Sequence, residues 1–232
     1  MGYINVTRDS KAPEDYVKVG LKHKGTIYTP EISRLSLTLT PYNSSDPPTM
    51  SSDFVAGPFT YTTKGYYIPP TTLWNDYSTI TSFECIVKYK FTSMPTDLET
   101  VVAWERLFGW EYMSNGCLGI WSYTAGQYAY QATTPVTVDT WYWMKIQIDS
   151  SRNVTYSLST DGENYTQLVT FVDDTYSWSN IYSYTKIGFG YHAWIPNETR
   201  ELDCGVIDFK ETNIKINGND ILYYFHQNYG EY

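Results

Sequence analysis

The chain has 232 residues, of which 42% are hydrophobic and 18% aromatic, and its formal net charge is −9 at pH 7. This hydrophobic content excludes a disordered chain, and the length suits one large β-sandwich or two small domains. Residues 1–50 carry a net charge of +1, so the acidic balance lies entirely in residues 51–232. An acidic body argues against a nucleic-acid partner, because phosphates require a basic surface.

Membrane and secretion signals are absent from the sequence, which has no apolar run near the length of a membrane span. Its first residues lack the basic and apolar regions of a secretory signal. We therefore expect no membrane partner. The three cysteines (Cys85, Cys117 and Cys204) have no CxxC spacing, which predicts buried free thiols and makes a zinc site or a disulfide framework unexpected. Free thiols fit folding in a reducing cytoplasm.

The N-terminal quarter of the chain differs from the rest. Leu35, Leu37 and Leu39 alternate with polar residues, which predicts a strand that ends near residue 40. Residues 41–53 are polar and rich in proline, as is typical of a domain boundary. We predict an N-terminal arm, anchor or small β subdomain over residues 1–53 and a main domain over residues 54–232. Edge strands of the main domain are an alternative for the first segment.

Short strands separated by turns are predicted in the middle of the chain. Residues 83–91 alternate between apolar and polar side chains, the period of a half-buried strand. Further strands are predicted at residues 104–113, 117–123 and 127–131, with turns at residues 114–116 and 124–126.

The clearest strand pair covers residues 141–149 and 153–160, after which Asp161 and Gly162 give a hairpin signal. Apolar side chains occupy the even positions from 142 to 148. Trp143 and Lys145 are therefore predicted to face outward, where they offer a surface for a partner.

The last predicted strands lie at residues 186–192, 204–209 and 212–217, and residues 173–183 are predicted to form a loop or a short helical turn. No sustained helical period is present. Ten or more short strands with frequent turns predict an all-β sandwich or jelly roll.

Aromatic residues beside in-strand glycines are the candidate ligand contacts. Trp110 and Tyr112 share one face of a predicted strand, and Trp121 and Tyr123 share a face of the next. Glycine inside a strand often marks the close approach of a ligand, and aromatic rings stack on the apolar faces of sugars. His192 and Trp194, near a strand end, are expected to be exposed. The predicted carbohydrate-binding residues are Trp110, Tyr112, Trp121, Tyr123, His192 and Trp194. The alternative is that the rings fill the sandwich core.

Catalytic and metal signatures are missing. Glycosidases of the jelly-roll class place paired carboxylates on one strand face, and no strand here has that pattern. The nearest acids are Glu105, Glu111, Asp208 and Glu211. Loop acids form no specific calcium signature. We expect a non-enzymatic protein and assign no catalytic or metal-binding residue.

Three segments carry a family resemblance: residues 141–162, residues 187–190 and residues 205–218. They resemble the second half of concanavalin A-like (laminin-G-type) jelly-roll domains, in particular those of bacteriophage fibre and decoration proteins. The resemblance implies a concanavalin A-like jelly-roll β-sandwich and a lectin-like virion surface protein that binds host or environmental polysaccharide.

The same resemblance implies other virion proteins as partners, a homo-oligomer such as a trimer, and assembly into the virion in the bacterial cytoplasm. A bound calcium ion is common in such domains. Two other functions stay open: a purely structural capsid or tail component, and a polysaccharide-degrading enzyme.

Overall fold

The structure is a computed structural model that describes residues 4–8, 17–23, 26–28, 39–68, 79–104, 107–122, 124–173, 186–192 and 200–220. Contacts divide the chain into two units, Met1–Arg34 and Leu35–Tyr232. Among the described residues no α-helix is present. Within this part of the chain, no helix has the length and apolarity needed to cross a bilayer.

The first unit contains an antiparallel sheet in the order β1-β2-β3. Its strands are β1 (Ile4–Arg8), β2 (Val17–His23) and β3 (Thr26–Tyr28). The N-terminal segment thus includes a small β subdomain. The predicted boundary at residue 53 differs from the division after Arg34, because residues 40–41 pair with the sandwich and the Tyr66 hydroxyl donates to the Pro48 carbonyl oxygen at 2.8 Å.

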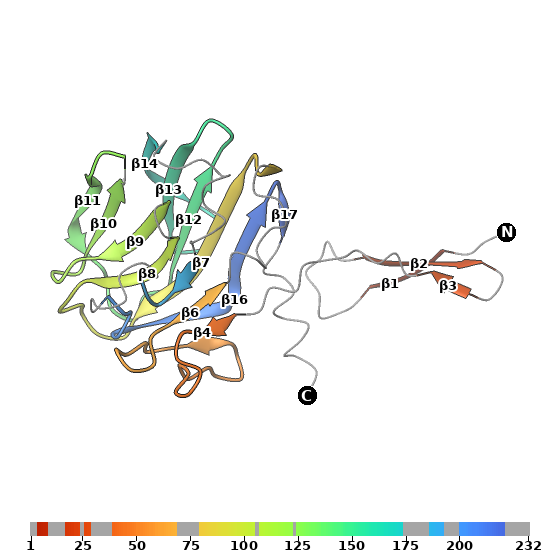
Figure 1. Ribbon diagram of the computed structural model, residues 1–232, viewed down its shortest axis with the longest axis horizontal. Helices are drawn as coiled ribbons and strands as arrows, with labels where there is room; N and C mark the ends of the chain where they lie inside the picture. Colours follow the sequence, from red (N-terminus) through yellow and green to blue (C-terminus); the bar gives the residue numbers. More distant parts are fainter. Residues whose placement is uncertain are drawn as a thin grey trace. The chain divides into compact units, whose positions relative to one another are not determined.

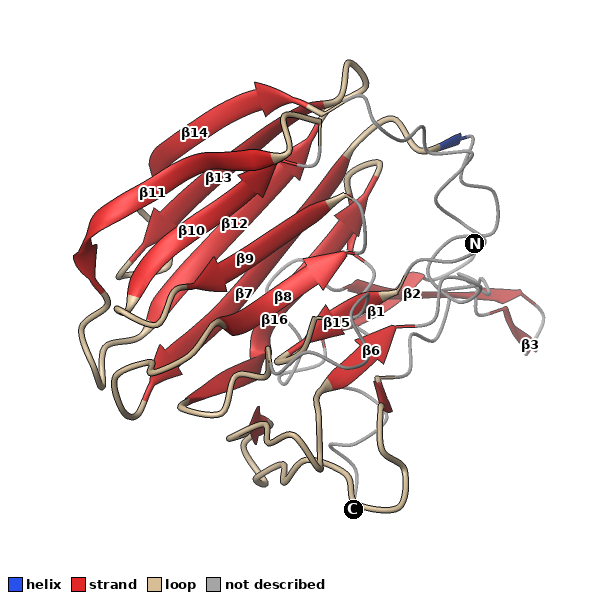
Figure 2. Ribbon diagram, turned by 60° about the vertical axis from the view of Figure 1, so that its left-hand side comes forward, coloured by secondary structure: helices blue, strands red, loops and turns tan. Residues whose placement is uncertain are grey.

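The second unit is a sandwich of two antiparallel sheets (Figures 1 and 2). Sheet I has the order β11-β10-β9-β8-β15-β6-β4. Its strands are β4 (Thr40–Pro41), β6 (Tyr66–Ile68), β8 (Glu99–Trp104), β9 (Phe108–Tyr112), β10 (Cys117–Ser122), β11 (Gln127–Pro135) and β15 (Ile187–Phe189).

Sheet II has the order β14-β13-β12-β7-β16-β17, and β5 pairs with β16. Its strands are β5 (Val55–Ala56), β7 (Phe83–Phe91), β12 (Tyr142–Ile148), β13 (Asn153–Ser159), β14 (Thr166–Val172), β16 (Gly205–Ile216) and β17 (Asn219–Asp220). The all-β, concanavalin A-like jelly-roll prediction is confirmed by this arrangement.

The core lies between the sheets, where the alternating side chains of both meet. In β7, every second residue from Phe83 to Phe91 is buried. The strand pairs with β12 on one side and β16 on the other. The predicted strand pair of residues 141–149 and 153–160 is confirmed, because β12 and β13 are antiparallel neighbours. The turn signal at Asp161 and Gly162 is also confirmed, since β13 and β14 pair on either side of it. Fully buried aromatic rings, including Trp104 and Tyr156, fill the centre.

Two strand predictions need correction. The strand predicted at residues 104–113 is the end of β8 followed by β9, which turns back on it at Leu107. β8 was missed because all six of its residues are buried, so they show no alternation. The strands predicted at residues 204–209 and 212–217 are a single strand, β16. The pairing of β16 with β7 is irregular between Asp208 and Asn213. The polar residues at this irregularity therefore have the sequence pattern of a turn between two strands.

Two other predictions fall partly outside the described residues. Leu39 is buried, as alternation predicted, whereas Leu35 and Leu37 lie outside the described part. Of the loop predicted at residues 173–183, only residue 173 is described.

Candidate functional site

Two of the predicted sugar-stacking residues belong to the core. Trp110 is 0% exposed and Tyr112 is 2% exposed. The Trp110 Nε1–H donates to the Tyr89 hydroxyl at 3.1 Å, and that hydroxyl lies 2.6 Å from the Tyr112 hydroxyl. The expectation that these rings stack on a ligand is therefore corrected. Because side chains alternate along β9, Trp110 and Tyr112 both point between the two sheets. They fill the sandwich core, as the alternative interpretation of the sequence had it.

The opposite face of β9 has a different character. We call it the outer face of sheet I, since it lies away from the core. Gly109 pairs with Ala103, and Gly119 pairs with Glu111. Small residues therefore surround the Glu111 side chain on three strands.

Gly119 leaves room for an aromatic ring. A Cβ atom at this position would lie 2.7 Å from Cε1 of Tyr128, closer than carbon atoms can pack. The absence of a side chain thus lets the Tyr128 ring lie directly over β10. The in-strand glycine signal correctly marked a close approach, here by a ring of the same chain.

Glu111 is the centre of a charged cluster on this face. Its Oε1 lies 3.7 Å from His192 Nε2 and 3.5 Å from Arg200 Nη1. The side chains of Glu111 and His192 are 6% and 3% exposed, whereas that of Arg200 is 25% exposed. Because burying a carboxylate is costly unless a partner compensates it, the neighbouring guanidinium is the natural counterion.

The predicted exposure of His192 is wrong, since the residue is 2% exposed. The chain turns at Gly190, whose φ is +68°, immediately after β15 ends. A Cβ atom at Gly190 would lie 2.4 Å from the Phe59 ring, so glycine is required at this turn. The turn leads residues 191 and 192 back into the fold, both of them buried.

Burial sets the protonation of the cluster. Burial and the nearby Arg200 guanidinium lower the pKa of His192 to about 4, so its imidazole is neutral at pH 7. Burial first, and then the Glu111 carboxylate, raise the pKa of the Tyr128 hydroxyl, against the opposing effect of Arg200. The site therefore presents neutral hydrogen-bonding groups beside one ion pair.

Trp121 completes the group. It is half-buried, and its ring meets the Tyr128 ring edge to face with the centroids 5.1 Å apart. We name Glu111, Trp121, Tyr128, His192 and Arg200 the Glu111 cluster. The fold thus links two predicted site residues, Trp121 and His192, through three others. Tyr123 and Trp194 lie outside the described residues.

Sequence reasoning missed Tyr128 and Arg200 and named Glu111 only as an imperfect catalytic acid. The in-strand Gly119, against which the Tyr128 ring packs, was the one sequence signal near Tyr128. Arg200 had none, since a lone arginine far along the chain carries no pattern.

The outer face of sheet II carries the residues that alternation predicted there. Lys88 lies between two rings, with its Nζ 4.8 Å from the centroid of Trp141 and 4.9 Å from that of Trp143. Trp143 Nε1–H donates to Glu211 Oε2 at 3.1 Å, and Lys88 Nζ donates to Glu211 Oε1 at 2.7 Å. Burial alone would lower the pKa of Lys88, but hydrogen bonds to Glu211 and Asp208 raise it.

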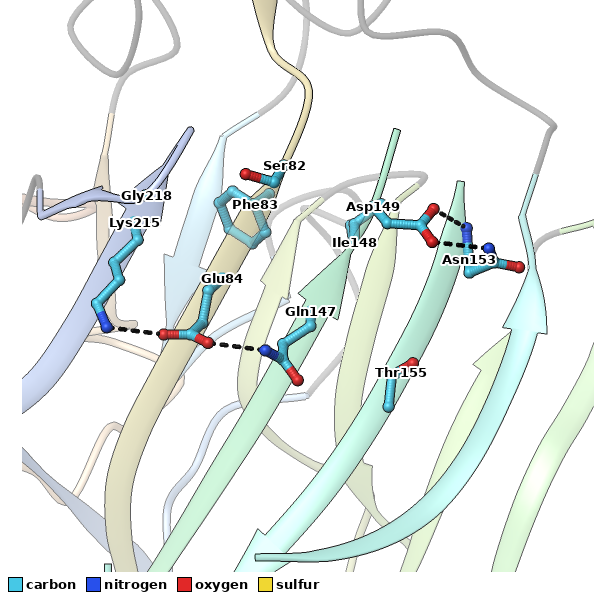
Figure 3. A pocket seen from close by; sticks show the side chains of 10 residues that line it. All are labelled: Ser82, Phe83, Glu84, Gln147, Ile148, Asp149, Asn153, Thr155, Lys215 and Gly218. Atoms are coloured by element: carbon cyan, nitrogen blue, oxygen red, sulfur yellow. Dashed lines mark hydrogen bonds and ion pairs between the residues drawn. The ribbon is translucent and has the colours of Figure 1, made fainter. Parts of the chain in front are cut away.

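A groove of about 390 Å³ opens on the same face (Figure 3). Glu84 accepts bonds from Lys215 Nζ at 3.1 Å and Gln147 Nε2 at 2.9 Å. At the other end, Asn153 Nδ2 donates to Asp149 Oδ2 at 2.7 Å. These side chains bind each other across the groove, so a ligand would have to displace existing bonds.

One group of side chains in the described part of the chain has the donor types and spacing of a metal site. It consists of Glu99, Asp203 and Cys204. Burial, followed by the neighbouring Asp203 carboxyl group, raises the pKa of Glu99 to about 8. Burial is also the main reason that the pKa of the Cys204 thiol is raised. All three cysteines are free and buried, as predicted.

No protein-family model matches the sequence, and no curated protein matches it. Solved structures do match the fold. The chain is similar to the receptor-binding domain of the botulinum neurotoxin C/D mosaic serotype, with a TM-score of 0.53 and 9% identity over 90% of this chain and 49% of that chain. It is also similar to a tryptophan-to-alanine mutant of HCR/D, with a TM-score of 0.51 and 11% identity over 97% of this chain and 51% of that one.

The chain spans about half the length of these two structures. Identities this low show the fold alone. Together with the two-sheet topology, they define the fold as a jelly-roll β-sandwich.

Proposed function

We propose that the protein is a non-enzymatic carbohydrate-binding module and that the Glu111 cluster contacts the glycan. The observation that carries the proposal is a buried carboxylate, held near a neutral histidine and an arginine, beside the half-buried Trp121–Tyr128 pair. Sugar recognition requires this combination: an aromatic ring for the apolar face of a pyranose and fixed polar groups for its hydroxyls.

The electrostatics favour hydroxyl recognition. Neutral His192 can donate one hydrogen bond and accept another, and the protonated Tyr128 hydroxyl can do the same. Arg200 is more exposed than Glu111 and His192, so its guanidinium is the group best placed to meet an acidic sugar. A lectin-like jelly roll is a fold compatible with such a module.

The test begins with a glycan and bacterial-capsule array probed with the full-length protein. For a glycan that binds, we expect Trp121→Ala and Arg200→Ala each to weaken the affinity at least tenfold, which corresponds to about 1.4 kcal/mol. Isothermal titration calorimetry measures the change, and circular dichroism verifies folding.

Trp143→Ala is the matched control, because Trp143 is also half-buried but lies on the outer face of sheet II. It should bind the glycan like the wild type. Binding lost in Trp143→Ala and kept in Trp121→Ala would place the glycan on sheet II and contradict the proposal. A blank array from folded protein would favour a structural role.

A polysaccharide-degrading enzyme is the second candidate, favoured by one observation. Glu111, His192 and Tyr128 bring three proton-transfer groups to one face, and a pKa near 4 leaves His192 free to act as a base at neutral pH. Release of reducing ends from a polysaccharide panel, abolished in His192→Gln, would support this reading over simple binding.

The finer proposal places the module on a bacteriophage virion, as a fibre or decoration protein assembled in the host cytoplasm. The resemblance of residues 141–162 and 205–218 to such domains supports it. Other virion proteins would then hold the chain through residues 1–53, and copies would associate as a homo-oligomer such as a trimer. Virions that still incorporate the chain after deletion of residues 1–50 would refute this anchor.

A further inference from the structure

The fold brings Glu99 next to Asp203 and Cys204, which are neighbours in the sequence about a hundred positions after it. Glu99 begins β8 of sheet I, and Cys204 precedes β16 of sheet II. One donor atom from each of the three lies within 4.8 Å of the other two. Metal–ligand distances of about 2.0–2.3 Å place the ligand atoms of one ion roughly 3–4 Å apart, so donors within 4.8 Å of one another need only small shifts to bind the same ion.

A second observation concerns Glu99 itself. The residue is 1% exposed, and its Oε2 atom is buried with no hydrogen-bond partner. Buried carboxylate oxygens are normally paired, since an unpaired one loses its hydration without compensation. The Glu99 side chain also hydrogen-bonds Asp203 and Cys204, and a cation bound by Oε2 would supply the partner that this one oxygen lacks.

The backbone around Cys204 is held in place. Its carbonyl oxygen accepts hydrogen bonds from Thr92 N at 2.8 Å and Thr92 Oγ1 at 3.1 Å. The next residue, Gly205, is packed so closely that a Cβ atom would lie 2.8 Å from Leu202 Cδ1. The thiol therefore projects from a fixed position, as a ligand must if binding is not to cost much conformational entropy.

The donor set selects the metal. Calcium and magnesium take oxygen ligands and do not use cysteine sulfur. A thiolate with two carboxylates suits zinc, which accepts both sulfur and oxygen in tetrahedral sites. Asp203 is exposed, so the cluster is reached from solvent.

We infer that Glu99, Asp203 and Cys204 form a zinc site that links sheet I to sheet II, with water as the fourth ligand. On binding, the Cys204 thiol proton and any proton on Glu99 leave to solvent, so that thiolate and carboxylate reach the ion. The cysteine spacing made zinc unexpected, because sequence motifs detect several ligands close together in the chain, whereas Glu99 lies about a hundred positions before Asp203 and Cys204.

Cobalt(II) and zinc are the probes. The full-length protein, stripped with a chelator, should show a near-ultraviolet thiolate-to-cobalt charge-transfer band when Co²⁺ is added, and Zn²⁺ should displace it. Zn²⁺ should raise the melting temperature, since a ligand that binds only the folded state stabilises it. Ca²⁺ should do neither.

Cys204→Ser should abolish the band, whereas Cys117→Ser, a second buried free cysteine outside the cluster, should keep it. Asp203→Asn, at an exposed position that folding tolerates, should weaken zinc binding at least tenfold. A folded wild type without the band, or a band that persists in Cys204→Ser, would overturn the site. So would unchanged zinc affinity in Asp203→Asn.

Discussion

The outer faces of the two sheets differ in how far their ionisable side chains are exposed to solvent. On sheet I, Glu111 and His192 are nearly inaccessible to solvent and are surrounded by small residues. On sheet II, Glu84, Lys215 and Glu211 remain partly exposed and pair across the strands, and one pair, Lys88 with Asp208, is 12% and 11% exposed. A solvated network of this kind is ordinary for an exposed sheet face, and each pair contributes little.

The Glu111 carboxylate of sheet I, whose side chain is 6% exposed, is harder to explain by stability. A buried ion pair is often no better for stability than apolar residues of the same volume. The burial of Glu111 beside Arg200 therefore marks this face as a candidate functional site. The candidate site thus lies where burying a charge is costly, on sheet I, whereas the groove of about 390 Å³ lies on sheet II among side chains that already bind each other (Figure 3).

The largest expected effect separates the core from both outer faces. Trp110→Ala should lower the free energy of unfolding by about 3–5 kcal/mol, because the ring is fully buried between the sheets. Trp143→Ala should cost roughly 1–2 kcal/mol, since it removes one hydrogen bond and a cation–π contact at a partly exposed position. Chemical denaturation measures both. Equal losses of unfolding free energy in the two variants would contradict the assignment of Trp110 to the core and Trp143 to the surface.

A smaller effect comes from His192 as the pH falls. Its pKa is near 4 in the folded protein against 6.5 ordinarily, so the unfolded chain binds the proton more tightly. The contribution to stability is full above pH 6.5 and is lost as the pH falls towards 4, with about 2 kcal/mol gone by pH 5. Denaturation at pH 7.5 and pH 5 measures it.

His192→Gln is the control for this pH dependence, because glutamine keeps polar groups at the position and does not titrate. The variant should lose less stability than the wild type between pH 7.5 and pH 5. The same pH profile in both proteins would show that another group is responsible and that the charge cluster of sheet I is not specially sensitive to acid.

Two glycines on the outer face of sheet I provide a finer test. Gly119→Ala should displace the Tyr128 ring and weaken glycan binding about tenfold, at a cost in stability of roughly 1–2 kcal/mol. Gly109→Ala is the matched control on the same face, because its added methyl would meet nothing closer than 3.7 Å. Calorimetric titration of both variants with the same glycan compares them, and equal binding by both would argue against a role for the Tyr128 ring.

The smallest effect is expected on sheet II. Lys215→Ala should change the free energy of unfolding by less than about 1 kcal/mol, since the Lys215 side chain is 37% exposed in its pair with Glu84. A double-mutant cycle with Glu84→Ala isolates the pair energy. A coupling energy well above about 1 kcal/mol would show that the exposed pairs of sheet II contribute as much to stability as buried ones.

Local patterns in the sequence determined much of the fold. The alternation of residues 83–91 and 142–148, the Asp161–Gly162 turn and the free cysteines were all correctly predicted. These features depend on a side-chain period of two or on the conformational preferences of single residues, which a sequence displays directly. The outward orientation of Trp143 followed from the same period.

Only the tertiary structure decided which face of each strand meets the partner sheet. It placed Trp110 in the core, brought Glu111 beside His192 and Arg200, and set Glu99 next to Cys204. Each of these depends on the register between strands that are distant in the chain, and register is set by the packing of both sheets together. Alternation shows that a strand has two faces, but the fold is needed to show what each face contacts.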